Sequence, residues 1–574
     1  MRGAGAAAVR IAARRSAAPG QSQDATNVPS GGYVQSAAEA TERSPLIGTQ
    51  SSSYLDHHVL VPEADPSFFS FRKLWAFTGP GFLISIAYLD PGNIEADLEA
   101  GSLAQYKLLW VVLWSSVAGL LLQRLAARLG TVTGRHMAEH AHGQYPRPVR
   151  ILVWLMIELA IIGNDMQEVI GTAIAFYLLS NRIIKVWQGV LITIFDTFTF
   201  LLIDKYGMRK LELLFATFIG IMAITFGYEY VVSAPPQGEV IKGVLLPLCE
   251  GCGTPELLQV ISIIGAIIAP HNLYLHSALV KTRDIDQNRP ADVRDANKYY
   301  FVETSIAVFV SFIINLFVVS VFGEGLYLRT NQEVRNVCLA SGSTYADIFP
   351  NNGDIVQADM FQGGIFLGCK FGVAAMYIWA VGLFAAGQSS TMTGCYSGQF
   401  VMEGFLHLQW SRWRRVLFTR TLAIVPTLWV AYYSRVEELS IMNDTLNSIM
   451  SVQLPFALLP LIAFTSNKHV MGEFVNSVPS TLLALFLSAG IIAANTFYVI
   501  QALPGGTLWI ALCAVLGIFY VSLVAYLALH MLFSMGLFEG LSRKAFVKKY
   551  LFYTPLFMEN SQHQPTDSTE GENT

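Results

Sequence analysis

Hydrophobic residues dominate long stretches of this chain, and short polar segments separate these stretches from one another. Each stretch is about as long as the roughly 20 apolar residues that an α-helix needs to cross a bilayer. The pattern therefore predicts an all-α, polytopic membrane protein with about twelve transmembrane helices, of which the eighth is long enough to contain a break or an overhang. The approximate limits are 74–98, 108–129, 150–180, 184–203, 209–231, 256–280, 300–324, 362–400, 415–433, 443–465, 479–500 and 507–534.

Polar segments flank this apolar region at both ends. Residues 1–70 are rich in Ala, Gly, Ser and Gln and hold no run of spanning length, so we expect a disordered cytosolic tail. The transmembrane domain is predicted at 71–540, followed by a cytosolic tail at 541–574. The segment from Glu42 to Ile47 matches the acidic dileucine pattern that sorting adaptors bind, although so short a pattern also arises by chance.

Composition narrows the class of protein further. Of the 574 residues, 53% are hydrophobic and 14% are charged, against roughly 25% charged in soluble domains, which excludes a water-soluble enzyme. A net charge of −4 gives no support for a nucleic-acid partner. There is no phosphate-binding loop and no nucleophile–base arrangement, so we expect neither an enzyme nor a cofactor. The expected partner is the lipid bilayer, at the plasma membrane or in endosomes and lysosomes.

Basic residues gather in alternate loops, which predicts the orientation in the membrane. The loop after the sixth run holds Lys281, Arg283 and Arg289, whereas the loops on the opposite side hold few Lys or Arg. Because basic loops stay in the cytosol, both termini are expected there. The same orientation places Cys249 and Cys252 outside, where a disulfide is favoured and a metal site is the alternative.

The first apolar run is interrupted by the motif Asp90-Pro91-Gly92-Asn93. Proline removes a backbone donor and glycine weakens a helix, so a break here exposes carbonyl groups beside a carboxylate and an amide. Oxygen groups of this kind bind cations, and breaks at mid-membrane are where transporters place their substrate. We expect Pro91 and Gly92 to act as hinges. The alternative is a packing kink in which Asp90 is satisfied by neighbours.

The sixth run contains a second interruption, at Ala269-Pro270-His271. Two proline-interrupted helices at corresponding places predict an inverted repeat, runs 1–5 against runs 6–10, with a site between them and a second hinge at Pro270. His276 follows five residues after His271, and both imidazoles titrate near neutral pH in water. They are therefore candidates for proton transfer, although a buried histidine is more often only hydrogen-bonded.

The third run carries three acids, Glu158, Asp165 and Glu168, at spacings that place them on one helical stripe. Carboxylates in a spanning helix are costly unless they face a wet path or a cation, and Arg420 in the ninth run is the candidate partner. The stripe is interpreted as a proton relay, with a purely structural ion-pair network as the alternative.

Taken with two further motifs, these residues resemble the Nramp (natural resistance-associated macrophage protein) family of divalent metal transporters, eukaryotic branch. The further motifs are Gly163-Asn164-Asp165-Met166-Gln167-Glu168 and Gly387-Gln388-Ser389-Ser390-Thr391-Met392-Thr393-Gly394, and the resemblance covers about 71–540. It implies a LeuT-like 5+5 inverted repeat with helices 1 and 6 broken, and proton-coupled uptake of Mn²⁺ or Fe²⁺ into the cytosol, with Cd²⁺, Co²⁺ and Zn²⁺ as further candidate substrates.

The resemblance also implies roles for particular residues. The metal ligands of the family match Asp90 and Asn93, with oxygens from the Ala87 and Ala266 carbonyls and an amide from Asn447. The proton route of similar proteins maps onto Asp90, His271, Glu158, Asp165, Glu168 and Arg420.

One position departs from the family pattern. The family has Met-Pro-His where this chain has Ala269-Pro270-His271, so a thioether ligand is missing. Thioethers favour softer metals over Ca²⁺ and Mg²⁺, and we expect retained Mn²⁺ and Fe²⁺ transport with relaxed selectivity. Three alternatives stay open: a transporter that prefers Mg²⁺ or Ca²⁺, a non-transporting sensor on the same scaffold, and a transporter of organic cations or amino acids.

Overall fold

The computed structural model describes residues 59–61, 69–203, 208–407, 410, 412–433, 436–501 and 507–537. The predicted tails and the segment from Glu42 to Ile47 lie largely outside these residues. Within them the fold is helical, apart from a two-residue parallel pairing of β1 (Val59–Leu60) with β2 (Arg283–Asp284). The all-α polytopic prediction is therefore confirmed.

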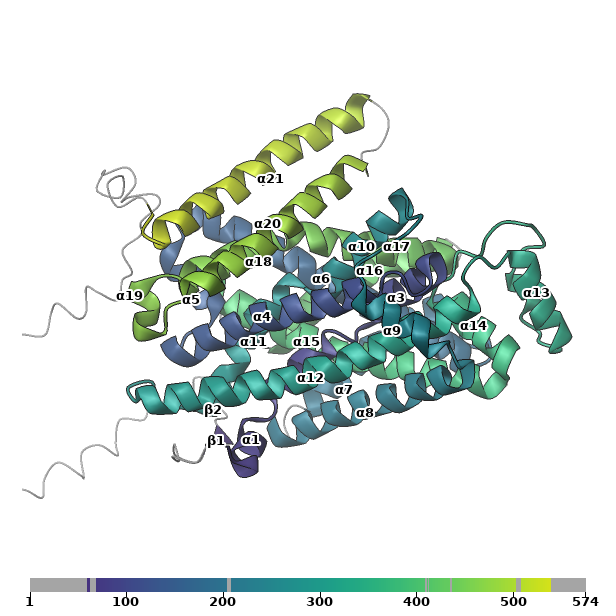
Figure 1. Ribbon diagram of the computed structural model, residues 1–574, viewed down its shortest axis with the longest axis horizontal. Coiled ribbons are helices and arrows are strands. Elements are labelled where there is room, and N and C mark those ends of the chain that lie inside the picture. The colour runs from purple at the N-terminus through teal and green to yellow at the C-terminus, as the bar shows by residue number, and fades with distance from the viewer. Residues whose placement is uncertain are drawn as a thin grey trace, which may run out of the picture. The chain divides into compact units, whose positions relative to one another are not determined.

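The first half of the fold begins with a short helix and a broken helix. These are followed by a short helix between two long helices, then by two more long helices and a final short one (Figure 1). The elements are α1 (Phe71–Phe77), α2 (Pro80–Ile86), α3 (Pro91–Ala104), α4 (Leu109–Thr133), α5 (Met137–Gln144), α6 (Arg147–Leu179), α7 (Val186–Ile203), α8 (Met208–Ser233) and α9 (Gln237–Leu245).

The second half repeats this order, again starting with a broken helix, as the 5+5 prediction requires. Its elements are α10 (Thr254–Ile267), α11 (Pro270–Leu279), η3 (Val280–Thr282), α12 (Pro290–Gly325), α13 (Asn331–Ala340), η4 (Ala346–Ile348), α14 (Met360–Phe371), α15 (Val373–Leu406), α16 (Arg412–Tyr433), α17 (Val436–Gln453) and α18 (Pro455–Thr465). After it come α19 (Lys468–Met471), η5 (Gly472–Phe474), α20 (Val478–Gln501) and α21 (Thr507–Ser534).

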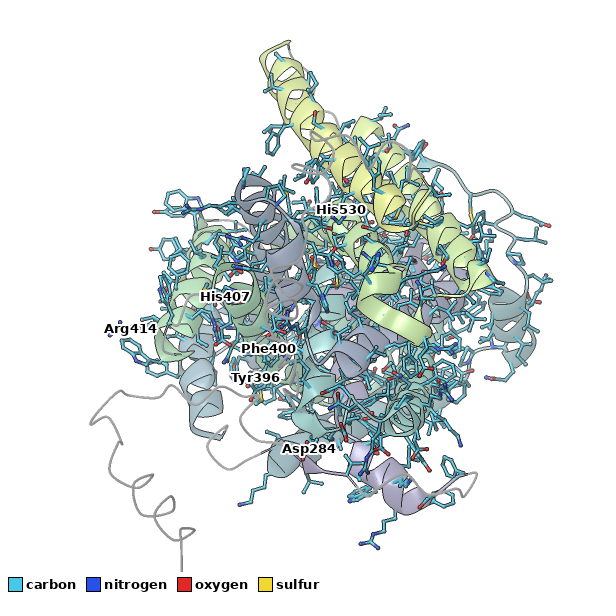
Figure 2. All side chains as sticks on the ribbon, turned by 90° about the vertical axis from the view of Figure 1, so that its left-hand side faces the viewer. Asp284, Tyr396, Phe400, His407, Arg414 and His530 are labelled. Carbon is cyan, nitrogen blue, oxygen red and sulfur yellow. A yellow bond between two sulfur atoms is a disulfide. The ribbon has the colours of Figure 1, made fainter. Side chains whose placement is uncertain are left out.

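The predicted runs correspond to these helices with one clear adjustment. The 362–400 run is divided at Gly372, whose positive φ of 97° ends α14 and allows the spanning helix α15 to start at Val373. The C-terminal part of α15 can be followed in Figure 2 through Tyr396, Phe400 and His407. Of the two alternatives for this run, a break and an overhang, the structure shows the break.

By length and composition, nine helices of the described ranges are able to cross a membrane. The other three predicted runs correspond to α2–α3, which is interrupted, to α6, which carries three acids, and to α7, which includes the apolar stretch Val186–Phe195. Many large apolar side chains on the outer faces of the helices are exposed, as lipid-facing residues are. Examples are Trp114, Phe195, Phe309, Trp429 and Phe486.

The centre of the fold is built by α3, α6, α10, α15 and α17. The helix α6 packs along α15 and also contacts α3 and α17, while α10 packs against both α3 and α17. The two last helices, α20 and α21, lie beside α18 (Figure 1). The broken helices are therefore enclosed by protein, which is the condition for irregular backbone at membrane depth.

Candidate functional site

The first break lies between α2, which ends at Ile86, and α3, which starts at Pro91. Asp90 is the N-cap of α3, and its Oδ1 accepts a hydrogen bond of 2.7 Å from the backbone N–H of Asn93. Proline suits the first position of a helix because its missing N–H has no partner there anyway. The non-helical residues are therefore 87–90, and Pro91 and Gly92 belong to the first turn of α3. The break thus lies a few residues earlier in the chain than the sequence prediction placed it.

The second break is constructed in the same way. The helix α10 ends at Ile267, and α11 starts at Pro270 with Ala269 as its N-cap. In a continuous helix the carbonyl of Ala266 would accept from the N–H of residue 270, which proline lacks. Pro91 stands in the same relation to the carbonyl of Ala87. Each proline therefore frees the carbonyl oxygen four residues before it.

The side chain of Asn93 connects the two breaks. Its Nδ2 donates to Asp90 Oδ1 at 2.8 Å, to the carbonyl oxygen of Ala266 at 3.2 Å and to that of Ala87 at 3.3 Å. Asp90 and Asn93 are only 2% and 1% exposed. Oxygens from both breaks thus converge on one buried point.

The amide oxygen of Asn93 has no hydrogen-bond partner in the described part of the chain, although it is buried. Nitrogen and oxygen of an amide exchange places when the group turns about its last side-chain bond. That turn would add an amide oxygen to the carboxylate and the two carbonyls. Such an all-oxygen set suits Mn²⁺ and also the harder ions Mg²⁺ and Ca²⁺.

The side chain of Asn447 contacts the backbone of the first broken helix. Its Nδ2 donates to the carbonyl of Gly92 at 3.0 Å, and its Oδ1 accepts from Gln167 Nε2 at 2.7 Å. Gln167 also donates to the carbonyl of Asn443 at 3.0 Å, so one side chain of α6 ties α17 to the site. Asn447 is therefore present at the site, but its oxygen is engaged by Gln167.

The residues predicted around the second break occupy different places. Ala269 is buried within the break, and its small side chain is 2% exposed. His271 lies in the first turn of α11, with a buried Nδ1 that has no partner among the described residues. His276 lies farther along α11, where its Nδ1 contacts Gln123 Oε1 of α4 at 2.9 Å. The two histidines thus do not share a partner.

The acids of α6 are buried at its contact with α15 and α16. Glu168 Oε2 accepts from Arg420 at 2.9 Å, and its Oε1 accepts from Ser390 at 2.7 Å, so the predicted arginine partner is found for this acid. Asp165 lies against α15, because a Cβ added to Gly394 would be 2.7 Å from its Oδ1. Neither carboxylate oxygen of Glu158 has a hydrogen-bond partner in the described ranges. The stripe therefore holds one direct ion pair and two acids outside it.

The similarities of this chain to known proteins agree with the geometry. The model of the natural resistance-associated macrophage protein-like family matches residues 81–501. This chain belongs to the Nramp family. Protein Malvolio of Drosophila melanogaster is 57% identical over 496 residues, covering 84% of this chain and 83% of that protein. Natural resistance-associated macrophage protein 1 of Homo sapiens is 55% identical over 499 residues, covering 86% and 91%.

A solved relative shares the Nramp fold. The crystal structure of the Eremococcus coleocola manganese transporter has a TM-score of 0.71 and 27% sequence identity, and the match covers 84% of this chain and 98% of that one. The predicted family, eukaryotic relationship and membrane-transporter class are confirmed. The family consists of metal transporters rather than enzymes.

In this Nramp chain, α12 supplies groups that the sequence reasoning missed. Asn315 Nδ2 donates to the carbonyl of Tyr88 at 3.0 Å, and Ser311 donates to that of Ser85 at 3.0 Å. Glu303 accepts from the backbone N–H of Gly79 and, at 3.1 Å, from that of Gly81. Asn315 thus caps a carbonyl within the break, whereas Glu303 satisfies N–H groups at the start of α2, which have no helical partner. The signal was available: polar residues 303, 311 and 315 recur on one face of an apolar run.

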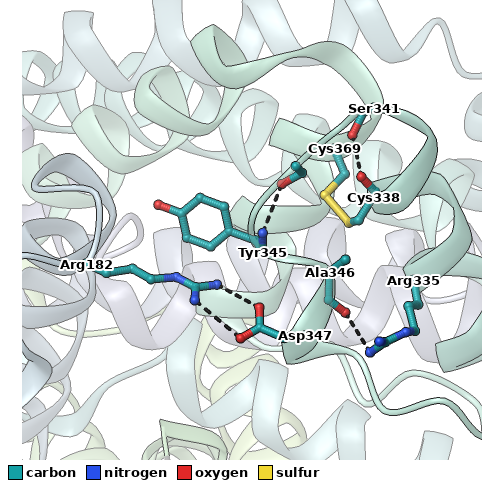
Figure 3. Close-up of a disulfide and its surroundings, with 9 residues drawn as sticks. Arg182, Arg335, Cys338, Ser341, Tyr345, Ala346, Asp347 and Cys369 are labelled. Carbon is teal, nitrogen blue, oxygen red and sulfur yellow. Dashed lines mark hydrogen bonds and ion pairs between the residues drawn. A yellow bond between two sulfur atoms is a disulfide. The ribbon is translucent and has the colours of Figure 1, made fainter.

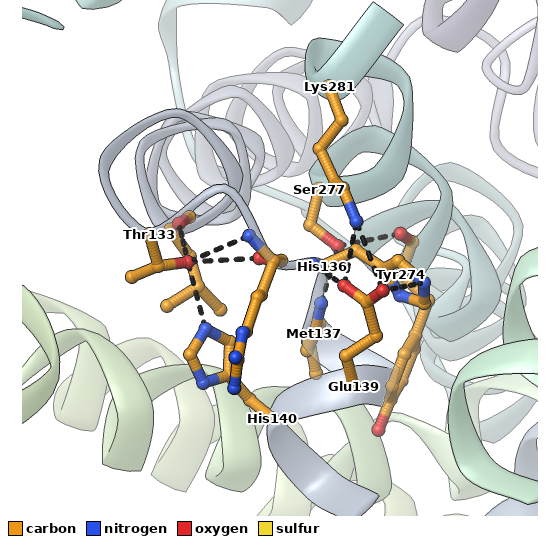
Figure 4. Close-up of polar contacts among 10 residues, drawn as sticks. Thr133, His136, Met137, Glu139, His140, Tyr274, Ser277 and Lys281 are labelled. Carbon is orange, nitrogen blue, oxygen red and sulfur yellow. Dashed lines mark hydrogen bonds and ion pairs between the residues drawn. The ribbon is translucent and has the colours of Figure 1, made fainter. Parts of the chain in front are cut away.

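The end of α11 away from the break is anchored to α5 (Figure 4). Lys281 Nζ contacts both carboxylate oxygens of Glu139, at 2.8 and 3.1 Å, and Ser277 Oγ accepts from the N–H of Met137 at 3.0 Å. Burial raises the pKa of Glu139, whereas the charges and hydrogen bonds of His136 and Lys281 lower it. The lowering effects together are larger, so the pKa lies below its ordinary value. The second half of the broken helix thus has a fixed end.

The segment between α13 and α14 is cross-linked at the other face of the fold (Figure 3). A disulfide joins Cys338 to Cys369, and Cys249 is bonded to Cys252, so the disulfide alternative holds for the CxxC pair. Nearby, Arg182 contacts Asp347 at 3.2 Å, and this hydrogen bond lowers the pKa of the exposed carboxyl. Disulfides persist in oxidising compartments, and the orientation of this face in the membrane stays a prediction.

Proposed function

We propose that this protein transports divalent transition-metal ions, Mn²⁺ and Fe²⁺ first, across the membrane into the cytosol together with protons. The observation that carries the proposal is the convergence at Asn93, where the carboxylate of Asp90 and the carbonyls of both breaks surround one buried point. Support comes from the solved relative, which is a manganese transporter. Cd²⁺, Co²⁺ and Zn²⁺ are further candidate substrates.

The site would replace the water shell of the ion. Asp90 supplies a negative charge, and the carbonyls of Ala87 and Ala266 supply oxygens that need no deprotonation. Because the carbonyls belong to different broken helices, an ion that binds both draws the two breaks together. Rotation at Pro91, Gly92 and Pro270 would then close one side of the site and open the other.

Proton movement would start near the metal site and follow α6. Asp90 and His271 flank the breaks, and Glu158, Asp165 and Glu168 with Arg420 form the buried stripe that could pass a proton onward. His276, bonded to Gln123, is a more remote member of this set. An inward-negative potential would favour entry of each positive charge by about 2.3 kcal/mol per 100 mV.

Selectivity is expected to be relaxed. Ala269 replaces the thioether that the family places at this break, so the remaining donors are oxygens, which also bind Ca²⁺ and Mg²⁺. A preference for Mg²⁺ or Ca²⁺ is therefore the second candidate function, and it rests on this same residue.

The proposed orientation follows the basic loops, with both termini in the cytosol and the domains divided at residues 70 and 540. The protein would act in endosomes and lysosomes or in the plasma membrane, and the segment from Glu42 to Ile47 would bind sorting adaptors. No resident cofactor is proposed.

Purified protein in proteoliposomes tests the proposal. Under an inward proton gradient, wild-type protein should accumulate Mn²⁺ and acidify the lumen in proportion to the metal. The isosteric variant Asp90→Asn should lose uptake about a hundredfold or more, since a bound dication loses its only carboxylate there. Asp354→Asn removes an acid from a surface loop and should transport within about twofold of wild type, as expected for surface substitutions.

Each alternative predicts a different outcome. Persistent Mn²⁺ uptake by Asp90→Asn would show that the ion binds elsewhere. Absence of uptake by folded wild-type protein would favour the sensor. Stronger inhibition of Mn²⁺ uptake by Ca²⁺ or Mg²⁺ than by Fe²⁺ or Cd²⁺ would favour the hard-ion transporter. Metal uptake with no change of lumenal pH would remove proton coupling while leaving the metal site intact.

A further inference from the structure

A basic cavity lies between α4 and α12, and none of the residues that line it belongs to either break. It has a volume of about 380 Å³, and four cationic residues line it, Arg124 and Arg128 from α4 and Arg294 and Lys298 from α12. Phe474 of η5 completes one wall. So many cations around one cavity repel one another unless a negative group lies among them.

The described part of the protein supplies little negative charge to this cavity. Arg124 lies over the ring of Phe301, 4.8 Å from its centroid, and Arg128 donates to the amide oxygen of Asn476. Within the described ranges neither arginine has a carboxylate within 4 Å. Arg294 does pair with Glu473 at 3.0 Å, but both side chains are largely exposed, so this pair contributes little.

Several hydrogen-bond donors of the cavity also lack an acceptor among the described residues. They are Arg128 Nε, Asn297 Nδ2 and Thr304 Oγ, and Thr304 is 2% exposed. Buried donors are nearly always paired in folded proteins, so a set of unpaired donors beside cations indicates a missing acceptor. An anion with several oxygens, such as a phosphate ester, has the required chemistry.

A second hollow, partly lined by leucines, adjoins the cavity and bears on the source of that anion. This second hollow of about 130 Å³ shares Arg124 and Arg128 with the first, and leucines of α4 and α20 line it together with Ser477 and Ser480. These leucines are Leu121, Leu122, Leu125, Leu483 and Leu487. The two arginines therefore lie between the basic cavity and the leucines of α4 and α20.

The surroundings of the second hollow have the character of a lipid-facing surface. On α20, Leu482 and Phe486 are 61% and 75% exposed, and on α12, Ile306 and Phe309 are 47% and 62% exposed. Apolar side chains this exposed on spanning helices face acyl chains rather than water. A soluble anion would leave the leucines of the second hollow uncovered. A phospholipid would place its phosphate in the basic cavity and an acyl chain against these leucines.

We propose that the cavity of Arg124 and Arg128 binds an anionic phospholipid, with its phosphate groups at the arginines and Lys298 and an acyl chain along the leucines of α4 and α20. Basic pockets between helices at the cytosolic face bind lipid headgroups of this kind in other membrane proteins. The bound lipid would connect α4, α12 and α20. Because α4 also packs against α10 and α11, the site is linked to the second broken helix.

The full chain in neutral detergent can be titrated with short-chain phosphatidylinositol phosphate while binding is followed by native mass spectrometry. The double variant Arg124→Gln/Arg128→Gln should bind roughly 25-fold more weakly, at roughly fivefold per charge removed. Arg124→Lys/Arg128→Lys keeps both charges and should retain most of the affinity. The matched control Lys185→Gln/Lys242→Gln removes two charges from exposed positions and should bind within about twofold of wild type.

A second variant separates the lipid from a free anion. Leu483→Asp places a carboxylate in the second hollow, and it should weaken binding of the lipid while leaving binding of soluble inositol phosphate unchanged. The proposal is overturned if the glutamine variant binds as wild type does, if phosphatidylcholine binds equally well, or if inositol phosphate or inorganic phosphate binds as tightly as the lipid. These readouts measure binding alone, so they stand or fall independently of metal transport.

Discussion

The side-chain nitrogen of Asn93 lies 3.2 Å from the carbonyl oxygen of Ala266, so the first broken helix touches the second at the break itself. The partner carbonyl is available because Pro270 cannot donate the N–H that would otherwise occupy it. A residue of α3 thereby reaches a backbone group 173 positions away in the chain. The contact places any ion bound at Asn93 under the control of both helices.

Restoring the family thioether should sharpen metal selectivity. In Ala269→Met, a sulfur would enter the second break, and sulfur favours Mn²⁺, Fe²⁺ and Cd²⁺ over Ca²⁺. The Ca²⁺ concentration that halves Mn²⁺ uptake should rise about tenfold, which corresponds to about 1.4 kcal/mol of discrimination. Competition assays in proteoliposomes measure it. Ala269→Leu adds similar bulk without sulfur and should leave the Ca²⁺ competition unchanged; equal shifts in both variants would assign the effect to volume.

The close approach of α3 and α6 should make Gly171 intolerant of a side chain. A Cβ at Gly171 would lie 2.5 Å from Cβ of Pro91, which belongs to a rigid ring. Gly171→Ala should therefore destabilise the protein by about 1–3 kcal/mol, as overpacking does. Gly163→Ala lies on the same helix, where the nearest atom would be 3.6 Å away, and it serves as the control. Thermal unfolding in detergent compares them, and equal midpoints would refute the tight packing.

The disulfide between Cys338 and Cys369 should contribute more stability than the one between Cys249 and Cys252. The first spans 31 positions of sequence and the second only three. Cross-linking a longer loop removes more freedom from the unfolded chain, up to about 4 kcal/mol for the first and about 2 kcal/mol for the second. Double serine variants of each pair, unfolded by heat, test this order. A larger loss from the Cys249 and Cys252 pair would contradict it.

The contact between Glu139 and Lys281 should depend on pH in a defined direction. The pKa of Glu139 is lower in the folded protein than its ordinary value. The stabilisation from its charge is therefore fully present above the pKa of the unfolded state, and it is lost as the pH falls through the pKa of the folded state. At pH 7, Glu139→Gln should cost about 1 kcal/mol of stability, and the difference from wild type should shrink below about pH 4.

The exposed pair of Glu239 and Lys242 supplies the control for this experiment. Both side chains are more than half exposed, so Glu239→Gln should have almost no effect at either pH. Unfolding temperatures of the two variants and wild type at pH 7 and pH 4 give the comparison. A difference for Glu139→Gln that grows as pH falls would show that the carboxylate does not act as a charged partner of Lys281.

The sequence by itself determined the spanning helices, because runs of about 20 apolar residues have one stable solution in lipid. It also located both breaks to within a few residues, since Pro91 and Pro270 each remove a donor from a fixed position. The sequence also predicted Arg420 as a partner for the acids of α6, because buried carboxylates in a spanning helix need a cation or a wet path. The structure pairs Arg420 with Glu168.

Only the tertiary structure decided which groups meet. Gln167 of α6 contacts Asn447 of α17, and Asn315 of α12 contacts the carbonyl of Tyr88. The relative rotation of these helices is set by packing, which no local pattern contains. The same holds for the cavity of Arg124 and Arg128, whose walls come from α4, α12 and η5, and for the adjoining hollow, which α20 lines. Hydrophobic periodicity reports the environment of a residue, whereas the identity of its partner depends on contacts between segments far apart in the chain.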